Sequence, residues 1–458
     1  MNKLCLAFFC ALGVSYAIPS TTENDISTFT SPVTEKLEDS NKITTFVPSL
    51  SAIKPTISEK KSARYDGDQV LRIFTVNSKH RKKIKEIERE NKGQKWASNT
   101  TSVDIYIKKD RIDEVKQALN NASMDFRILV EDVQRAIDEE NPPQKFEELN
   151  EFTNRKGHRL TFEHYHRMAD VHGFMDYLAS ARSSQVSVHT LGESVEGRPI
   201  KMIKISSGKP NASAFWIDGG IHAREWIAVA SVSYIINELV ENRDSLDKEL
   251  QDTDFYIVPL LNPDGYEYSH ESERLWRKNR RRNLGAFCVG TDLNRNWDYE
   301  WGGSGSSKFP CQEIYAGSGP LSEPETKAVA NFILNNESKF KGFVTFHSYG
   351  QYILYPWGYA KRLPPDAEDL DRVGRIAAAA MKQAGGSSYS VGNSAALLYA
   401  AAGGSDDWAK GAAKIKYTYT IELRDTGRHG FLLPASHIKG SGKEAFAAIK
   451  AIAKEMNA

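Results

Sequence analysis

The 458-residue sequence lacks an excess of charge of either sign. Its 60 lysines and arginines are balanced by 59 aspartates and glutamates, which leaves a formal net charge of +1. This balance gives no support to a nucleic-acid partner or a membrane-surface partner. Long apolar runs are also missing after the N-terminus, so the sequence predicts no transmembrane span in the mature chain.

The composition is otherwise that of a globular protein, with 40% hydrophobic, 26% charged and 10% aromatic residues. These fractions exclude wholesale disorder, a collagen-like chain and a coiled-coil rod. At about 100–200 residues per domain, the length allows about two to four domains.

The N-terminus has the pattern of a cleaved secretory signal over residues 1–17. Lys3 precedes a short apolar stretch, and the small residues Ser15 and Ala17 stand where a signal peptidase would recognise them. A buried N-terminal helix is the alternative, but the polar tract that follows offers no core to cover it. We therefore expect a secreted, extracellular protein.

Cysteine is scarce, and removal of the signal would leave Cys288 and Cys311 of the four cysteines. An oxidising compartment and an even count favour a disulfide between them. Two unpaired buried thiols are the alternative.

Three regions follow the signal. Residues 18–63 are rich in Ser, Thr, Lys and Glu with weak periodicity, and we interpret them as a disordered linker. Residues 64–158 predict a small α+β module that ends in an exposed hinge over 138–158. Its predicted elements are strands at 70–76, 103–107 and 126–130 and helices at 79–91 and 110–120.

Residues 159–458 alternate helical and strand patterns, which predicts one α/β domain with a largely buried mixed sheet. Helical periodicity covers 171–178 and an apolar helix covers 228–239. Apolar runs predict strands at 214–218, 255–260, 342–346 and 417–421.

The sequence has no HExxH motif, no GxSxG motif and no cysteine outside the expected pair, so several hydrolase classes lack support. Instead, His222 and Glu225 offer an imidazole and a carboxylate at the end of a predicted strand, and His347 ends another. Three such ligands suit a catalytic zinc ion, although the spacing of His222 and Glu225 taken alone is more typical of a solvated ion pair.

Two further stretches carry polar groups beside apolar runs. Glu422 ends a predicted strand, where it is either a structural partner of a nearby arginine or a general base for a metal-bound water. Residues 276–282 are basic, and most of them are expected to form a solvated face. Residues 292–297 combine Asn and Arg, and an arginine fork binds a carboxylate through two parallel hydrogen bonds.

These motifs together resemble the zinc metallocarboxypeptidases of the pancreatic carboxypeptidase A/B family. The matching stretches are HAREW (222–226), NPDGY (262–266), WRKNR (276–280), DLNRNW (292–297), HSY (347–349), YPWGY (355–359), GGSDDW (403–408) and IELRDTGRHGFLLPAS (421–436). The segment at 64–150 resembles the family's activation segment. The resemblance implies a mixed central sheet flanked by helices, preceded by a small α+β activation domain, and it places a disulfide at Cys288 and Cys311.

The resemblance also implies the catalytic groups. His222, Glu225 and His347 match the ligands of one zinc ion, and Glu422 matches the general base that takes a proton from the zinc-bound water. Arg277 matches the residue that polarises the scissile carbonyl. All of these residue types are retained, which disfavours a non-enzymatic binding protein on the same fold.

Four more residues match the family's substrate-binding positions. Asn294 and Arg295 match the pair that grips the terminal carboxylate of a peptide, Tyr399 the mobile tyrosine, and Arg224 an auxiliary carboxylate site. A buried arginine needs an anion, and the end of a peptide chain supplies one. We therefore expect the substrates to be peptide or protein C-termini.

Asp406 matches the position at the base of the family's specificity pocket, and Ser394 matches a small lining residue. A confined carboxylate favours a C-terminal Lys or Arg and disfavours an apolar residue, which predicts B-like specificity. An A-like enzyme that releases apolar residues is the alternative, and an ion pair between Asp406 and a neighbouring lysine would silence the preference. Gly358 is not diagnostic.

The resemblance further implies a zymogen in which the activation segment covers the cleft until it is cut. Arg155, Lys156 and Arg159 lie in the predicted hinge and suit a trypsin-like activating protease. We expect a monomer. Sequons for N-glycosylation begin at Asn99, Asn121, Asn211 and Asn336.

Overall fold

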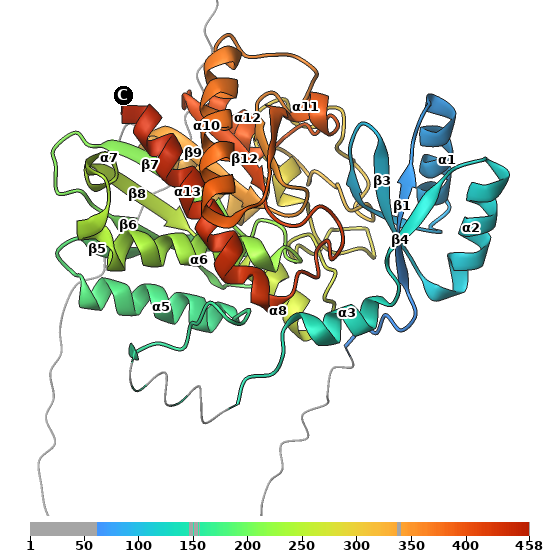
Figure 1. Ribbon diagram of the computed structural model, residues 1–458, viewed down its shortest axis with the longest axis horizontal. Coiled ribbons are helices and arrows are strands. Elements are labelled where there is room, and N and C mark those ends of the chain that lie inside the picture. The colour runs from blue at the N-terminus through green and yellow to red at the C-terminus, as the bar shows by residue number, and fades with distance from the viewer. Residues whose placement is uncertain (1–61, 146–149, 151–153, 155, 337–339, 458) are drawn as a thin grey trace, which may run out of the picture. The chain divides into compact units, whose positions relative to one another are not determined.

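The computed structural model describes residues 62–145, 150, 154, 156–336 and 340–457 (Figure 1). The predicted signal at 1–17 and nearly all of the predicted linker at 18–63 lie outside the described residues. The chain from Glu59 to Ala458 forms one compact unit, which contains both sheets described below.

The N-terminal part of this unit is a four-stranded antiparallel sheet with the strand order β2-β3-β1-β4. Its strands are β1 (Gln69–Phe74), β2 (Gln94–Ser98), β3 (Ser102–Ile107) and β4 (Phe126–Val130). Its helices are α1 (Ser78–Arg89), α2 (Ile112–Asn121) and α3 (Val133–Glu140), with a short 3-10 turn η1 (Lys109–Arg111) before α2.

Helical periodicity explains how α1 and α2 pack against this sheet. Ile84 and Ile87 of α1 and Val115 and Leu119 of α2 are spaced three or four positions apart, and all four are buried in one cluster with β1 and β3. The side chain of Asn77 caps α1 by accepting a hydrogen bond from the backbone N–H of His80 at 2.9 Å.

Two elements of this region were not expected from the sequence. In β2 only Trp96 is buried, so the strand lacks a clear apolar alternation. Helix α3 extends into the stretch that we interpreted as an exposed hinge, 138–158, and its last residue, Glu140, is only 1% exposed. The expectation of exposure is therefore wrong at Glu140, although Asp138 and Glu139 before it are exposed.

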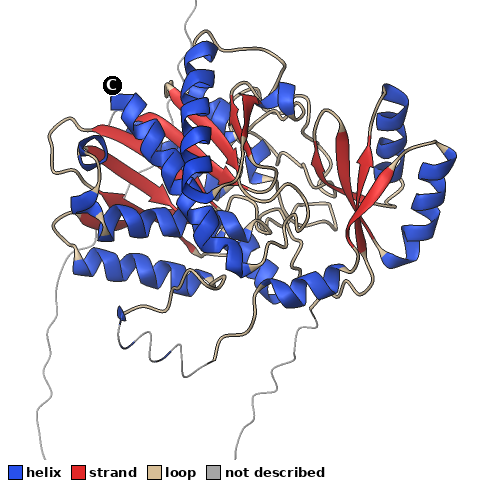
Figure 2. Ribbon diagram, viewed as in Figure 1, coloured by secondary structure: helices blue, strands red, loops and turns tan. Residues whose placement is uncertain are grey.

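The C-terminal part is an eight-stranded mixed sheet with the strand order β11-β10-β12-β9-β7-β8-β6-β5 (Figures 1 and 2). The strands β12, β9, β7 and β8 in the middle of this order are parallel to one another, whereas β10 and β6 pair antiparallel with β12 and β8. The strands are β5 (Val186–Glu193), β6 (Pro199–Ile205), β7 (Ser213–Gly219), β8 (Thr253–Val258), β9 (Phe340–His347), β10 (Tyr352–Tyr355), β11 (Ser390–Asn393) and β12 (Tyr417–Glu422).

Helices cover both faces of this sheet because its central strands are apolar on both sides. Phe215 and Ile217 of β7 face one core, and Trp216 between them faces the other. Helices α5 (Met168–Ala181), α6 (Trp226–Glu241), α10 (Ala367–Gly385) and α13 (Ile438–Asn457) contribute to the first core, and α9 (Pro324–Asn335) and α12 (Ser405–Gly411) to the second.

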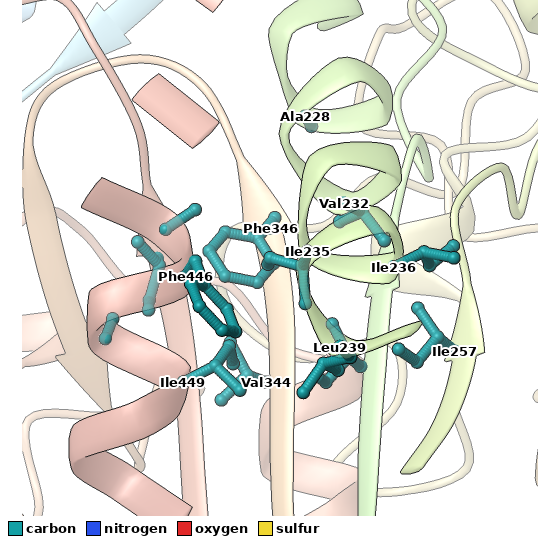
Figure 3. Packing of buried hydrophobic residues seen from close by; sticks show 14 of the residues in the cluster. Ala228, Val232, Ile235, Ile236, Leu239, Ile257, Val344, Phe346, Phe446 and Ile449 are labelled. Atoms are coloured by element: carbon teal, nitrogen blue, oxygen red, sulfur yellow. The ribbon is translucent and has the colours of Figure 1, made fainter. Parts of the chain in front are cut away.

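Figure 3 shows part of the first core, where α6 and α13 pack on the strands. The remaining helices of the C-terminal part are short. They are α7 (Lys248–Gln251), α8 (Pro263–Glu271), α11 (Ser394–Leu397), η2 (Arg243–Ser245), η3 (Leu293–Arg295) and η4 (Ala435–His437). Among the described residues, no helix has the length and apolarity needed to cross a bilayer.

Candidate active site

The turn after β7 brings His222 and Glu225 into the interior. Gly220 has a φ of +66°, and a Cβ at this position would lie 2.7 Å from Val229 Cγ2, so the turn requires glycine. His222 is 4% exposed, and Glu225, which directly precedes α6, is 3% exposed.

His347 is the last residue of β9, which runs parallel to β7, so the same edge of the sheet carries all three candidate ligands. His222 Nδ1 lies 2.8 Å from Glu225 Oε1, and His347 Nδ1 lies 3.1 Å from Glu225 Oε2. The candidate ligand atoms of the three residues all lie within 4.8 Å of one another. Two imidazole nitrogens and one carboxylate form a donor set that suits zinc, with room for a further ligand.

The electrostatics of this cluster favour a charged carboxylate. Burial opposes ionisation of Glu225, but the adjacent imidazoles outweigh it and hold its pKa well below the usual range. Burial also opposes protonation of His347, yet Glu225 raises the pKa of this imidazole to about 8. Each group thus favours the charged form of the other, whereas a bound cation would favour the charged carboxylate and the neutral imidazole.

Asp292 contacts both His222 and Arg277, a role that the sequence alone did not predict. Its Oδ1 lies 3.1 Å from His222 Nε2, and its Oδ2 accepts a hydrogen bond from Arg277 Nη2 at 2.9 Å. A carboxylate that holds the outer nitrogen of a ligand histidine fixes the orientation of the ring. The position of Asp292 within the DLNRNW motif was the only available signal.

Glu422 ends β12, and the parallel register of β9 and β12 pairs it directly with His347. Burial raises the pKa of Glu422 to about 7, while His347 acts in the opposite direction. The structure therefore places a carboxyl group with a strongly raised pKa beside the candidate metal ligands.

These residues line a cavity of about 340 Å³. Nine of the predicted site residues line this cavity. They are the three candidate ligands, Glu422, Arg277, Asn294, Arg295, Tyr399 and Asp406. Arg224 is not among the lining residues. Its guanidinium lies 4.2 Å from the centre of the Phe431 ring and 3.6 Å from Glu313 Oε2.

Arg295 is buried without a carboxylate partner among the described residues. Its guanidinium donates to the backbone carbonyls of Gly305 at 2.9 Å and Asn294 at 2.7 Å. The side chain of Asn294 is fixed by the backbone N–H of Ser405, which donates to Oδ1 at 2.9 Å. The cavity therefore contains a cation that is oriented but not neutralised.

Asp406 lies in another part of the cavity and is 7% exposed. Burial raises its pKa, and its Oδ2 lies 3.5 Å from Ser394 Oγ. No lysine or arginine in the described part of the chain forms an ion pair with it. Lys410, four positions away, instead donates to Asp366 Oδ2 at 2.6 Å. The alternative in which a neighbouring lysine forms an ion pair with Asp406 therefore finds no support.

Residues of the N-terminal sheet line the same cavity. Tyr349 donates a hydrogen bond to Asp104 Oδ2 at 2.8 Å, and Arg72 binds both oxygens of Asp104 at 2.6 Å. The ring of Trp96 lies 5.0 Å from that of Phe431. The N-terminal sheet thus contacts loop residues of the C-terminal part at the cavity.

The predicted disulfide is confirmed, since Cys288 and Cys311 are bonded with an S–S distance of 2.09 Å. Of the basic residues in the predicted hinge, Lys156 and Arg159 are exposed, and Arg155 lies outside the described residues.

Comparison with known proteins agrees with this geometry. Residues 171–448 match the family model of zinc carboxypeptidases, and residues 71–140 match the model of carboxypeptidase activation peptides. The chain therefore belongs to the zinc carboxypeptidase family. More narrowly, it is a procarboxypeptidase, a zinc-dependent hydrolase preceded by its activation peptide.

Its relatives include both specificity types. The chain is 46% identical to carboxypeptidase B of Astacus astacus over 63% of this chain and 96% of that protein. It is 37% identical to carboxypeptidase A2 of Mus musculus over 84% and 93% of the two chains. The crystal structure of thrombin activatable fibrinolysis inhibitor superposes with a TM-score of 0.77 at 34% identity, covering 85% of this chain and 98% of that one.

Proposed function

We propose that the protein is a secreted zymogen that, once activated, removes Lys or Arg from the C-termini of peptides. The observation that carries the specificity is the carboxylate of Asp406, which is buried in the cavity without a cationic partner among the described residues. A buried, unpaired carboxylate is costly, and a basic substrate side chain would relieve that cost.

In this proposal His222, Glu225 and His347 hold the zinc, which supplies the Lewis acidity that activates water and polarises the scissile carbonyl. Glu422 accepts a proton from the attacking water and passes it to the departing amine nitrogen. Its raised pKa of about 7 suits both steps, because the group exchanges a proton readily near neutral pH. Arg277 donates hydrogen bonds to the carbonyl oxygen as negative charge develops there.

Arg295 and Asn294 account for attack at the last peptide bond. They bind the terminal carboxylate of the substrate. Nε and one N–H of Nη1 of Arg295 already bond backbone carbonyls, and the remaining N–H groups of the guanidinium are the donors for the carboxylate. An internal peptide bond has no carboxylate at this distance. Only the terminal bond is then held beside the metal ligands.

The specificity test is a panel of blocked dipeptides that differ only in the C-terminal residue. We expect kcat/KM to be highest for Arg and Lys, and Asp406→Asn to lower kcat/KM for Arg by about 30-fold or more, because loss of one partner of a buried charge pair costs at least about 2 kcal/mol. The same variant should leave turnover of a substrate ending in Phe unchanged or increased. Faster hydrolysis of Phe than of Arg by the parent enzyme would instead support the A-like alternative.

The activation segment is expected to cover the cleft, since Asp104, Arg72 and Trp96 line the cavity. We propose that a trypsin-like protease cuts near Lys156 or Arg159, which are exposed. Limited trypsin treatment should yield a fragment that begins near Lys156 or Leu160, and activity should rise as this fragment appears. A first cut elsewhere, or full activity before cleavage, would contradict the proposal. Sedimentation should show a monomer.

A further inference from the structure

A buried carboxyl group lies behind His347 and has no role in the proposed function. Asp218 is the penultimate residue of β7, and the parallel register of β7 and β9 pairs it with Thr345. Thr345 precedes His347 by two positions, so the two side chains emerge on the same face of β9. Asp218 is 1% exposed, and Thr345 is completely buried.

The three side chains form a continuous hydrogen-bonded series. Thr345 Oγ1 lies 2.6 Å from Asp218 Oδ1, and the same hydroxyl oxygen lies 3.3 Å from His347 Nε2. A carboxylate can only accept, so the hydroxyl proton points to Asp218. The oxygen of Thr345 is then free to accept a hydrogen bond from Nε2–H of the imidazole.

This arrangement fixes which nitrogen of His347 carries the proton. Nδ1 faces the other candidate ligands, at 3.1 Å from Glu225 Oε2 and 3.1 Å from His222 Nδ1. If Nε2 carries the proton, the lone pair of the neutral ring lies on Nδ1 and points to the metal position.

The buried carboxylate of Asp218 has only neutral hydrogen-bond donors among the described residues. Its second oxygen accepts a hydrogen bond from the indole Nε1–H of Trp216 at 2.7 Å, so its donors within the described residues are one hydroxyl and one indole. No lysine or arginine of the described chain forms an ion pair with it. A charge buried among neutral donors is costly unless a nearby cation compensates it.

We propose that Asp218 is a positioning residue for the zinc ligand His347 and acts through the hydroxyl of Thr345. This inference rests on the proposed ligand role of His347. The two imidazoles are then supported differently, because Asp292 contacts His222 directly, whereas Asp218 acts on His347 through one intervening hydroxyl. The relay orients the ring, sets its tautomer and increases the electron density at Nδ1.

The test measures zinc affinity rather than activity. The full-length chain is stripped of metal, and zinc binding is measured by competition with a chelator of known affinity. Thr345→Val removes the hydroxyl and keeps the shape of the side chain, whereas Thr345→Ser restores the hydroxyl. We expect Thr345→Val and Asp218→Asn to weaken zinc binding by about 10- to 100-fold, the usual effect of losing an outer partner of a ligand. Thr345→Ser should stay within about threefold of the parent, as expected when the hydrogen bond is retained.

Thr418→Val is the matched control, because Thr418 is a buried threonine of β12 whose hydroxyl bonds only a backbone carbonyl, that of Ile415 at 3.2 Å. It should bind zinc as the parent does. Parental affinity in either folded variant, Thr345→Val or Asp218→Asn, would overturn the proposal. If His347→Ala also kept parental affinity, the assignment of His347 as a ligand would be wrong instead.

Two measurements distinguish an unfolded variant from one that has lost only the relay. Circular dichroism reports whether the variant is folded, and the visible spectrum of the cobalt-substituted protein reports the environment of the metal. A folded Asp218→Asn chain with an altered cobalt spectrum and faster zinc release supports the relay even if Thr345→Val does not fold. A folded Asp218→Asn chain with the parental spectrum and release rate contradicts it.

Discussion

A buried ion pair joins the activation segment to the catalytic part of the chain. Glu140, at the end of α3, is 1% exposed, and Arg274 is 5% exposed. Arg274 Nε donates to Glu140 Oε2 at 2.7 Å and Nη2 donates to Oε1 at 2.5 Å. The other bonds of this guanidinium go to the backbone carbonyls of Arg224 and Phe431, both at 2.9 Å.

Glu140→Gln would remove the negative charge and keep the size of the side chain. The guanidinium of Arg274 would then be buried against neutral acceptors only. Removing one partner of a buried ion pair costs about 3–5 kcal/mol, and the two retained carbonyl bonds point to the lower value. At about 1.4 kcal/mol for each factor of ten, 3 kcal/mol corresponds to an increase of about 100-fold in the population with the segment displaced.

The assay compares hydrolysis of a blocked dipeptide by the uncleaved chain with hydrolysis after complete tryptic activation. In Glu140→Gln the ratio of the two rates should rise by up to about 100-fold, in proportion to the displaced population. Glu139→Gln is the control, since Glu139 is an exposed neighbour on the same helix, and it should leave the ratio unchanged. Equal ratios in the two variants would refute the idea that this ion pair holds the segment in place.

Three further outcomes are expected. Glu422→Gln should retain zinc by metal analysis and lose turnover by about 10²- to 10⁴-fold, since the group moves a proton and is not a ligand; near-parental turnover would exclude this role. Expression through a eukaryotic secretory pathway should attach glycan at the exposed Asn121 or Asn211, and not at Asn99. The side-chain oxygen of Asn99 accepts a hydrogen bond within the turn, and its amide nitrogen lies 3.4 Å from the hydroxyl of Tyr352. Peptide mass mapping after deglycosylation checks which asparagines carried glycan. Burial raises the pKa of Glu325 from 4.5 to about 7, so the folded chain binds a proton that the unfolded chain has lost, and its contribution to stability falls as pH rises from 4.5 to 7. Glu325→Gln should remove up to about 3 kcal/mol of that decline in urea unfolding, and an unchanged pH dependence would contradict it.

The candidate site could be predicted from the sequence because its residues follow strong local patterns. His347 and Glu422 each stand at the end of an apolar strand, and the strand assignments at 342–346 and 417–421 lie inside β9 and β12. The mixed sheet with flanking helices and the small α+β region are confirmed as well.

Contacts between segments that are distant in the sequence could not be predicted, because no local sequence pattern indicates them. Nothing near Glu140 or Asp104 in the sequence indicates that they would meet Arg274 and Tyr349. The relation of Asp218 to His347 depends on the register of β7 with β9, which a sequence pattern does not specify. Strand β2 was missed because it is largely polar, with Trp96 as its one buried residue.

The parallel pairing of β9 with β12 makes the position of Glu422, the proposed general base, depend on the number of residues in each strand. His347 and Glu422 are opposite each other, so their separation is set by the spacing of adjacent strands, about 4.8 Å. Inserting or deleting one residue within β12 would turn Glu422 to the opposite face of the sheet, away from the cavity. A strand that contributes no candidate metal ligand should therefore tolerate length changes as poorly as β9, which carries His347.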